Sequence, residues 1–169
     1  SLEYQAGIVK FLQRTDTILA LQAYQNLILS LQPNNEEIVY YPGSPWIAAS
    51  QLRNQDQLIL NEKHPADFLA LKTTMHKIVP HSRCHQRDAY EFLPAVLPPL
   101  LRRALIFIDP PYEQAQEWQV MLTLLLKCKQ RFPQGMYAVW YPIVAQQHLH
   151  FIRQIPLLKW CPVLLAEMT

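Results

Sequence analysis

A run of five apolar residues, Ala104–Ile108, ends directly at the tetrapeptide DPPY of residues 109–112. The run is short, rich in residues that favour β-structure and bounded by a turn signal, so it predicts a central strand of a parallel sheet. Apolar residues recur at helical spacing over Gln114–Phe132, and Met136–Trp140 forms a second buried strand-like run. This order predicts two parallel strands joined by a helical crossover.

Strand and helix patterns alternate from residue 57 to the end of the chain, whereas residues 3–32 show two apolar stripes at helical spacing only. Such alternation predicts an open α/β sheet, which binds its ligands at the carboxyl ends of the strands. The other expected strands are Gln57–Glu62, a short one within 78–86, and Val163–Ala166; the other expected helices are 47–52, 65–75, 89–97 and 146–155.

The DPPY turn carries the groups that are needed to activate an aromatic amine. The exocyclic amine of adenine is a poor nucleophile, because its lone pair is delocalised into the ring. The Asp109 carboxylate and the Pro110 backbone carbonyl can accept its two N–H groups, and Pro110 and Pro111 fix φ, so the acceptors are held in place beforehand. Tyr112 can stack on a base that has left its helix. The motif predicts transfer of a methyl group from a sulfonium to adenine, without a metal or a covalent enzyme intermediate. A proline-rich turn opened by aspartate is the structural alternative.

Further polar residues lie where a nucleoside cofactor could bind. Glu62 ends an expected strand, where an acid can accept from ribose hydroxyls or can simply be solvated. Asp88 follows the next expected strand and can accept from the cofactor's adenine amine or cap the helix 89–97. Ser44 begins a helix whose N–H groups favour a carboxylate, or it forms a plain cap and turn. Tyr141 and Pro142 either line this pocket or belong to the core.

Composition restricts the other classes of function. The chain has 169 residues, of which 50% are hydrophobic and 17% charged, as expected for one globular domain with a core. No apolar run approaches the roughly 20 residues that span a bilayer. The three cysteines, Cys84, Cys128 and Cys161, are far apart, and neither they nor the six histidines show metal-ligand spacing, so we expect reduced thiols and no metal site.

The net charge of +2 does not by itself indicate a nucleic-acid-binding protein. Arg83, Arg87, Arg102 and Arg103 could form a local basic patch, although scattered, solvated charge is the interpretation that the sequence favours. Only three glycines accompany 14 prolines, whereas average usage would give about 7% glycine. The chain therefore lacks the glycine-rich turn that nucleotide-binding α/β domains usually have.

Five motifs follow one another along the chain: YYPGSP (40–45), LNEKHP (60–65), RDAYEFL (87–93), LIFIDPPYE (105–113) and MYAVWYPIV (136–144). In this order they resemble the J-type family of bacterial large-subunit ribosomal RNA adenine-N6 methyltransferases. The same family has been described as required for the use of external DNA as a nutrient. The resemblance runs from about residue 3 to residue 168. DPPY occurs in many amino-methyltransferases, whereas YYPGSP together with WYP is more particular to this family.

The resemblance implies a Rossmann-like class I methyltransferase core over residues 37–169, with residues 1–36 as a helical insertion subdomain. It implies S-adenosylmethionine as cofactor and an adenine in large-subunit ribosomal RNA, free of protein, as substrate. The enzyme would be cytoplasmic and monomeric, without membrane association. The implied catalytic residues are Asp109, Pro110, Pro111 and Tyr112, and the implied cofactor-binding residues are Ser44, Glu62, Asp88, Ala89 and Asp109.

The chain also departs from the family. Lys63 replaces the leucine of the family's ELHP, and Ala89 replaces a glycine, which would strain the backbone if that position requires φ > 0. The family's first strand with its glycine-rich cofactor loop, and its closing strands, have no match here. We therefore expect a piece of a longer protein that alone binds S-adenosylmethionine poorly and is inactive. The alternatives are methylation of adenine in DNA or of glutamine in protein, and a non-catalytic nucleic-acid-binding factor.

Overall fold

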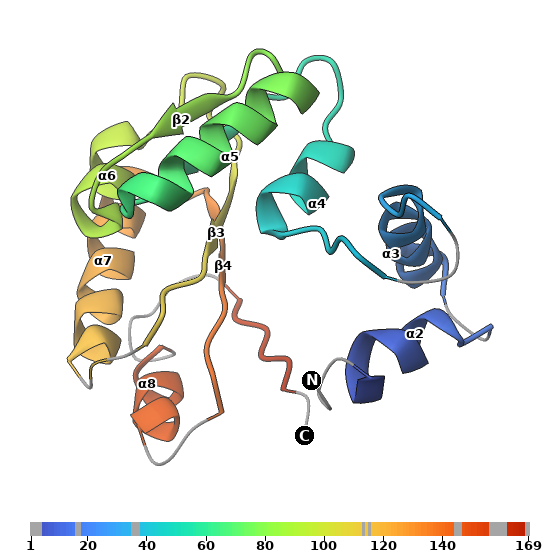
Figure 1. Cartoon of the computed structure of the whole chain (residues 1–169). Helices are drawn as coiled ribbons and strands as arrows, with labels where there is room; N and C mark the ends of the chain where they lie inside the picture. The colour runs from blue at the N-terminus through green and yellow to red at the C-terminus, as the bar shows by residue number, and fades with distance from the viewer. Residues whose placement is uncertain are drawn as a thin grey trace. The chain divides into compact units, whose positions relative to one another are not determined.

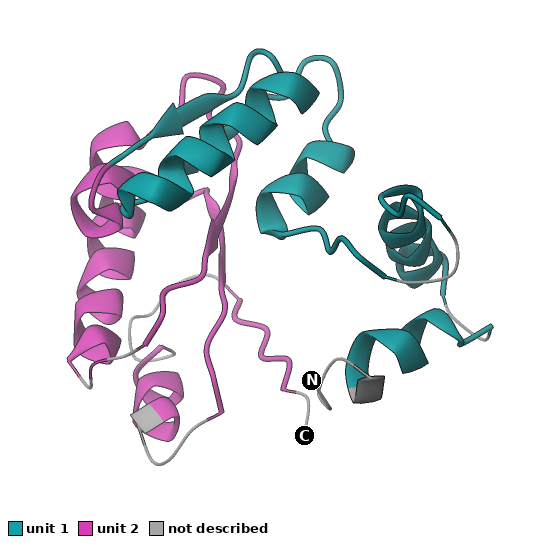
Figure 2. Ribbon diagram, in the orientation of Figure 1, with its two compact units in different colours: residues 1–86 teal, residues 87–169 magenta. Residues whose placement is uncertain are grey.

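The computed structural model describes residues 5–15, 18–34, 38–112, 114, 116–143, 147–155 and 162–167. They belong to two compact units, residues 1–86 and residues 87–169 (Figure 2). Helices alternate with short parallel strands in each unit (Figure 1), which confirms the α/β class. None of the described helices combines the length and the apolar character that are needed to cross a membrane.

The first unit begins with helices, as expected for residues 3–32. Residues 38–43 are extended, and the side chain of Gln32 ties them to the end of the preceding helix. Its Nε2 donates to the carbonyl oxygens of Ile28 and Tyr40, at 2.6 and 2.7 Å, and its Oε1 accepts from Val39 N at 2.7 Å. The elements are η1 (Gln5–Val9), α2 (Lys10–Leu12), α3 (Leu19–Ser30), α4 (Ser44–Ser50), β1 (Ile59–Asn61), α5 (Pro65–Ile78) and β2 (Arg83–His85).

The strands β1 and β2 form a two-stranded parallel sheet in which Leu60 lies opposite Cys84. The connecting helix α5 contacts β2 and buries Met75, which is 2% exposed. Pro65 begins α5, where its missing N–H costs nothing. The three elements form a β–α–β unit, which confirms the strand, helix and strand expected between residues 57 and 86.

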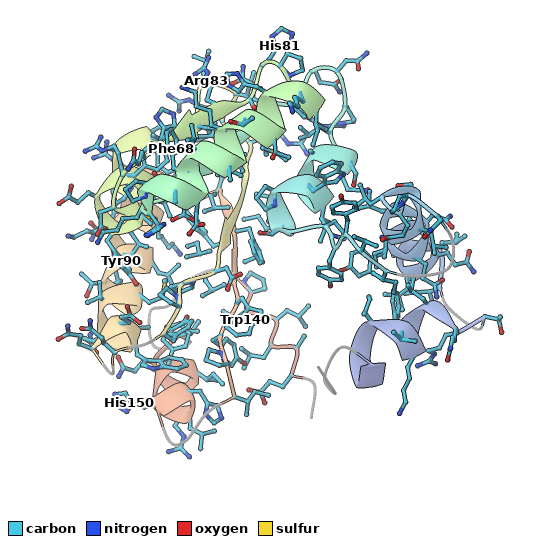
Figure 3. All side chains as sticks on the ribbon, in the orientation of Figure 1. Phe68, His81, Arg83, Tyr90, Trp140 and His150 are labelled. Carbon is cyan, nitrogen blue, oxygen red and sulfur yellow. The ribbon has the colours of Figure 1, made fainter. Side chains whose placement is uncertain are left out.

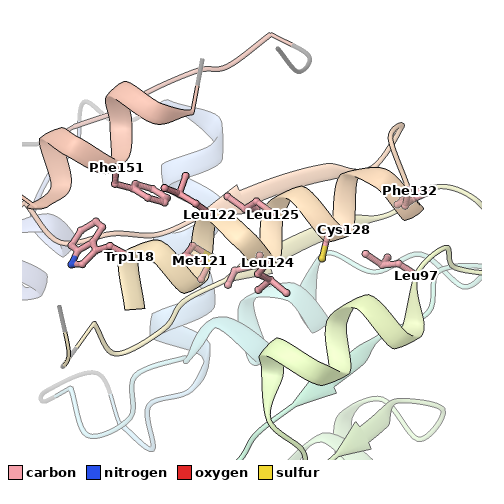
Figure 4. Close-up of a cluster of buried hydrophobic side chains, with 10 residues drawn as sticks. Leu97, Trp118, Met121, Leu122, Leu124, Leu125, Cys128, Phe132 and Phe151 are labelled. Carbon is pink, nitrogen blue, oxygen red and sulfur yellow. The ribbon is translucent and has the colours of Figure 1, made fainter. Parts of the chain in front are cut away.

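The second unit contains the larger core. β3 and β4 pair in parallel, with Ile106 opposite Tyr137. The buried face of α7 packs with Phe132 and with Phe151 of α8 (Figure 4). Burial raises the pKa of the Cys128 thiol in this core to about 11. The elements are α6 (Ala89–Val96), β3 (Leu105–Ile108), α7 (Glu117–Arg131), β4 (Met136–Val139) and α8 (Gln147–Gln154).

The structure limits one expectation about the strands and corrects another. Within the described residues β3 and β4 pair only with each other, and helices cover one face, so the central position expected for the strand at 104–108 stays a prediction. On the other face Leu105 is 66%, Phe107 53% and Met136 68% exposed. The expected last strand of this chain, Val163–Ala166, is wrong, because residues 162–167 are exposed and no neighbouring strand of the described chain pairs with them.

Two of the three cysteines lie within the described residues. Cys84 is half-buried, Cys128 is buried, and both are free thiols, as expected. Cys161 lies outside the described residues.

Candidate active site

The DPPY turn leaves the sheet at the carboxyl end of β3. Ile108 lies opposite Val139 of β4, and its carbonyl oxygen accepts from Trp140 N at 2.9 Å. Because the two strands are parallel, their carboxyl ends share one edge. The structure therefore brings residues 109–112 together with the Trp140–Pro142 segment. Asp109 is exposed at this edge, so its carboxylate is open to a ligand.

Tyr112 points back into the second unit. Its φ of 51° lies in the left-handed region, which is uncommon for a residue with a side chain. The centroids of the Tyr112 and Trp118 rings lie 4.3 Å apart, with 34° between the ring planes. The ring centroids of Trp118 and Phe151 of α8 lie 5.4 Å apart, and those of Phe151 and Tyr141 lie 6.1 Å apart. Four aromatic rings thus connect the DPPY turn, α7, α8 and the Trp140–Pro142 segment.

The phenol groups beside this turn are held in their neutral form. The Tyr112 hydroxyl is buried without a hydrogen-bond partner in the described part of the chain. Burial raises its pKa, and the nearby Tyr90 and Asp109 raise it further. The Tyr90 hydroxyl is also buried without a described partner, and burial, followed by Glu117 and Asp88, raises its pKa. Neither phenol can therefore act as a base near neutral pH. Asp109 is the carboxylate of the turn itself, and Glu117 of α7 lies beside the turn.

Tyr141 also belongs to this site. Its hydroxyl donates to Glu167 Oε1 at 2.8 Å. Burial, followed by the hydrogen bond to Glu167, raises the pKa of Tyr141 to about 12. The half-buried ring packs against the hydrophobic core of the second unit. The core interpretation is confirmed, and the side chain also lies beside the DPPY edge.

Asp88 and Ala89 form the start of α6. Asp88 is the N-cap, and its Oδ1 accepts from Tyr90 N at 2.9 Å. The capping alternative for Asp88 is thus confirmed, while its role toward a cofactor stays a prediction. Among the described non-glycine residues only Arg102 and Tyr112 have positive φ. Ala89 therefore lies in the first turn of a helix without backbone strain, and alanine in place of the family's glycine is compatible with this backbone conformation.

Glu62 and Ser44 belong to the first unit, whereas Asp88, Ala89 and the DPPY turn belong to the second. Glu62 follows β1, and its Oε1 accepts from His64 N at 2.8 Å. Ser44 is exposed and is the first residue of α4. The N-cap position of this helix is occupied by Gly43, so no side chain caps it. The described residues contain no group of three or more His, Cys, Asp or Glu side chains that could hold a metal ion.

Reasoning from the sequence missed the aromatic support of Tyr112. The spacing in 114–132 predicts that Trp118 faces the core, and it is 7% exposed, but its contact with Tyr112 was not predicted. Tyr90 was not predicted at the site either. The available signal was the short distance along the chain from DPPY to the first turn of α7, which places Glu117 and Trp118 beside the turn.

Known proteins resemble this chain over nearly its whole length. The sequence model of the family described as Ribosomal RNA large subunit methyltransferase D, RlmJ, matches residues 1–169. Proteins named Ribosomal RNA large subunit methyltransferase J from Escherichia coli K12 and Haemophilus influenzae are 40% and 36% identical to it. These matches cover 87% and 86% of the chain but 52% and 51% of the relatives. The chain therefore spans about half the length of these relatives.

A solved structure shows the same arrangement of the chain. The crystal structure of protein LPL1258 from Legionella pneumophila has a TM-score of 0.83 and 34% sequence identity. The match covers 92% of this chain and 58% of that one.

Proposed function

Since this chain belongs to the RlmJ family of large-subunit ribosomal RNA methyltransferases, we propose that its protein methylates N6 of an adenine in large-subunit ribosomal RNA. S-adenosylmethionine is the proposed methyl donor. The observation that carries the proposal is the DPPY turn at the carboxyl end of β3, beside Trp140–Pro142. This turn has an exposed carboxylate next to a rigid pair of prolines.

In the proposed reaction the turn holds the adenine amine by its two N–H groups. The Asp109 carboxylate accepts one, and the Pro110 carbonyl oxygen accepts the other. The lone pair of the amine would then be available to a methyl group. When bound, S-adenosylmethionine would supply that group from its sulfonium, and the electron pair of the broken C–S bond would stay on sulfur. The methylated amine would then lose one proton, for which the Asp109 carboxylate is the proposed acceptor.

Tyr112 and Trp118 would support the target base. The Tyr112 ring already packs against Trp118 in a tilted arrangement, with 4.3 Å between the ring centroids. A flipped base on its other face would extend the stack, and each base–aromatic contact is worth about 1–3 kcal/mol. The buried Trp118 would then act as a positioning residue, because it holds the Tyr112 ring in place.

Carboxylates of the described chain fit the chemistry of the proposed cofactor. Glu62 directly follows β1, and Asp88 lies shortly after β2. Ribose hydroxyls and an adenine amine are hydrogen-bond donors, and carboxylates at strand ends accept from such groups. We assign the ribose to Glu62, the cofactor's adenine to Asp88 and Ala89, and its methionine end to Ser44 and Asp109.

The proposed fold is a Rossmann-like class I methyltransferase sheet, with residues 1–36 as a helical insertion. Two observations support it. All described strands are parallel, and each strand pair is connected through a helix, α5 or α7. The exposed apolar side chains of β3 and β4 are typical of strands that a larger sheet and further helices cover. A protein-free ribosomal RNA substrate and a cytoplasmic, monomeric enzyme complete the proposal.

Asp109→Asn tests the catalytic assignment in the intact protein. It preserves the size of the side chain but weakens its acceptor, so we expect kcat to fall about 100- to 1000-fold, as for other preorganised polar groups. The value of kcat is measured by the transfer of tritiated methyl groups to protein-free large-subunit ribosomal RNA. Because Asp109 is exposed, the free energy of unfolding should change by less than about 0.5 kcal/mol.

Glu62→Gln is the matched control, because it neutralises a carboxylate at another strand end. It should raise KM for the cofactor and leave kcat within about threefold of the wild-type value. A contact that stabilises the ground state and the transition state equally affects KM and not kcat. Full turnover by the Asp109→Asn variant would show that the DPPY turn is not catalytic. Transfer to DNA or to a protein glutamine, with none to ribosomal RNA, would favour the corresponding alternative substrate.

A further inference from the structure

Residues 68–87 form one of the basic stretches of this chain without acidic residues; a longer one, 118–166, lies in the second unit. The segment 68–87 contains four of the 15 Lys and Arg residues and three histidines, but none of the 13 acidic residues. Without these four cations the remainder, with 11 cations and 13 acids, would carry a charge of −2 instead of the overall +2. The segment is therefore locally basic, although residues 1–86 as a whole hold seven Lys and Arg residues and seven acidic residues.

In the first unit, five side chains of this segment form what we call the basic ridge. They occupy the second half of α5, the turn that follows it, and the first residue of β2. α5 contacts β2, and His81 projects outward from the turn that joins them (Figure 3). The ridge consists of Lys72, His76, Lys77, His81 and Arg83, all of them exposed.

Carboxylates of the first unit do not neutralise the ridge. Its described acidic side chains bind other groups: Asp56 pairs with Arg53 at 2.9 Å, and Asp67 pairs with His64 at 3.2 Å. Glu62 accepts from His64 N at 2.8 Å. Within the described part of the chain, no ridge side chain forms an ion pair. The ridge therefore presents its positive charge to solvent.

The helix dipole explains only part of this arrangement. His76 and Lys77 lie in the last turn of α5, where a cation is favourable by about 0.3–1 kcal/mol. Lys72 lies one turn earlier, and His81 and Arg83 lie beyond the helix, so the dipole does not account for them. Exposed cations at these positions are available to a polyanion.

We propose that the basic ridge binds the phosphate backbone of the RNA substrate, on the unit that does not contain the DPPY turn. This inference rests on the proposed function, because that function makes RNA the partner. Phosphate contacts position a protein on a nucleic acid without reading its sequence. Lys72, Lys77 and Arg83 would each steepen the dependence of log K on log salt concentration by about 0.7–0.9.

The triple variant Lys72→Gln/Lys77→Gln/Arg83→Gln of the intact protein tests the ridge. Filter binding to deproteinised large-subunit ribosomal RNA is measured over a series of salt concentrations. We expect the affinity at about 0.1 M salt to fall more than tenfold and the salt slope to become shallower by about 2. Duplex DNA as competitor shows whether the ridge distinguishes RNA from DNA, and preferential loss of DNA binding would overturn the RNA assignment.

A charge-matched control is available in the second unit. Arg103→Gln/Lys127→Gln/Arg153→Gln removes the same charge from exposed positions and should lower RNA affinity less than threefold. Equal losses in the two triple variants would show that net charge alone matters, and the proposal would be wrong. Lys72→Arg/Lys77→Arg keeps the charges and should bind RNA like the wild type, which distinguishes lost charge from damaged folding.

Two readouts separate the ridge from the proposed reaction. The ridge variant should keep its affinity for the cofactor, and its kcat at saturating RNA should stay within about twofold of the wild-type value. The reason is that the three substitutions weaken only the binding of RNA. If the intact protein binds RNA through the ridge but transfers no methyl group, the proposed function fails and the ridge stands. If methyl transfer occurs and the ridge variant binds RNA normally, the ridge proposal fails.

Discussion

At the scale of single residues, Tyr112 combines two unfavourable features. Its backbone has a φ of 51°, and its hydroxyl is buried without a partner in the described chain. An unsatisfied buried hydroxyl costs about 1–3 kcal/mol, and unfavourable backbone conformations cluster at functional sites. The packing of its ring on Trp118 offsets part of this cost. Tyr112 is therefore better suited to binding a ligand than to stabilising the fold.

Replacement of Tyr112 by Phe tests this interpretation. The variant keeps the ring and removes the unsatisfied hydroxyl, so we expect the free energy of unfolding to stay equal or to rise by up to about 1 kcal/mol. Urea denaturation followed by tryptophan fluorescence measures the change. A loss of more than about 1 kcal/mol would mean that the Tyr112 hydroxyl has a partner in solution.

Tyr137→Phe is the matched control for this measurement. The Tyr137 hydroxyl lies 3.1 Å from the carbonyl oxygen of Cys128 and 3.0 Å from that of Phe132. Removing it deletes the side-chain hydrogen bond, while each carbonyl oxygen keeps its backbone donor, so this variant should lose about 1 kcal/mol. The two Tyr→Phe changes should therefore affect stability differently although the chemistry is identical.

At the scale of elements, the connection from α7 to β4 depends on a close contact. Phe132 follows α7 and is fully buried, and Gly135 N donates to its carbonyl oxygen at 3.1 Å. A Cβ atom on Gly135 would lie 2.5 Å from Cδ1 of the Phe132 ring. The ring cannot move away easily, because the surrounding core is closely packed. Glycine is thus required here by space, since its φ is not positive.

Gly135→Ala should therefore lower the free energy of unfolding by about 1–3 kcal/mol, as overpacking of a core typically does. Thermal and urea denaturation measure the effect. Gly7→Ala is the control, because Gly7 lies in η1 and nothing lies within 4 Å of an added Cβ. That variant should be neutral or slightly more stable. Equal stability of the two alanine variants would contradict the packing argument.

At the scale of the whole molecule, the two units differ in how much apolar surface they bury. The main hydrophobic cluster runs from Leu97 to Phe151 and lies entirely in the second unit. The buried hydrophobic residues of the first unit are Ile28, Leu58 and Met75 within the described ranges. Because local stability follows buried apolar contacts, we expect the first unit to open before the second.

Hydrogen exchange followed by mass spectrometry tests this order of opening. Amide hydrogens of α7 should be protected at least about tenfold more strongly than those of α3 under native conditions. The comparison uses the intact protein, with and without S-adenosylmethionine, so that stabilisation by a ligand is seen separately. Uniform protection along the chain would show that the two units open together.

Local patterns explain why much of the fold was predictable. The strand that ends at DPPY, the helix after it and the strand at 136–139 follow from neighbouring residues alone. The same is true of the helical start and of β1–α5–β2. The strand expected at 163–166 failed because a strand also needs a partner for its hydrogen bonds, and that partner is not specified by the segment itself. The division at residue 36 and the residue roles toward RNA and cofactor stay predictions.

The sequence by itself determined the order of most elements and the rigid Asp-Pro-Pro turn after β3. These features depend on residues that are close together in the chain. Only the tertiary structure decided that Tyr112 stacks on Trp118 and that one face of β3 remains exposed. It also decided that the described carboxylates of the first unit pair with groups outside the basic ridge. The physical reason is that burial and side-chain pairing depend on groups brought together from distant positions, which no local pattern encodes.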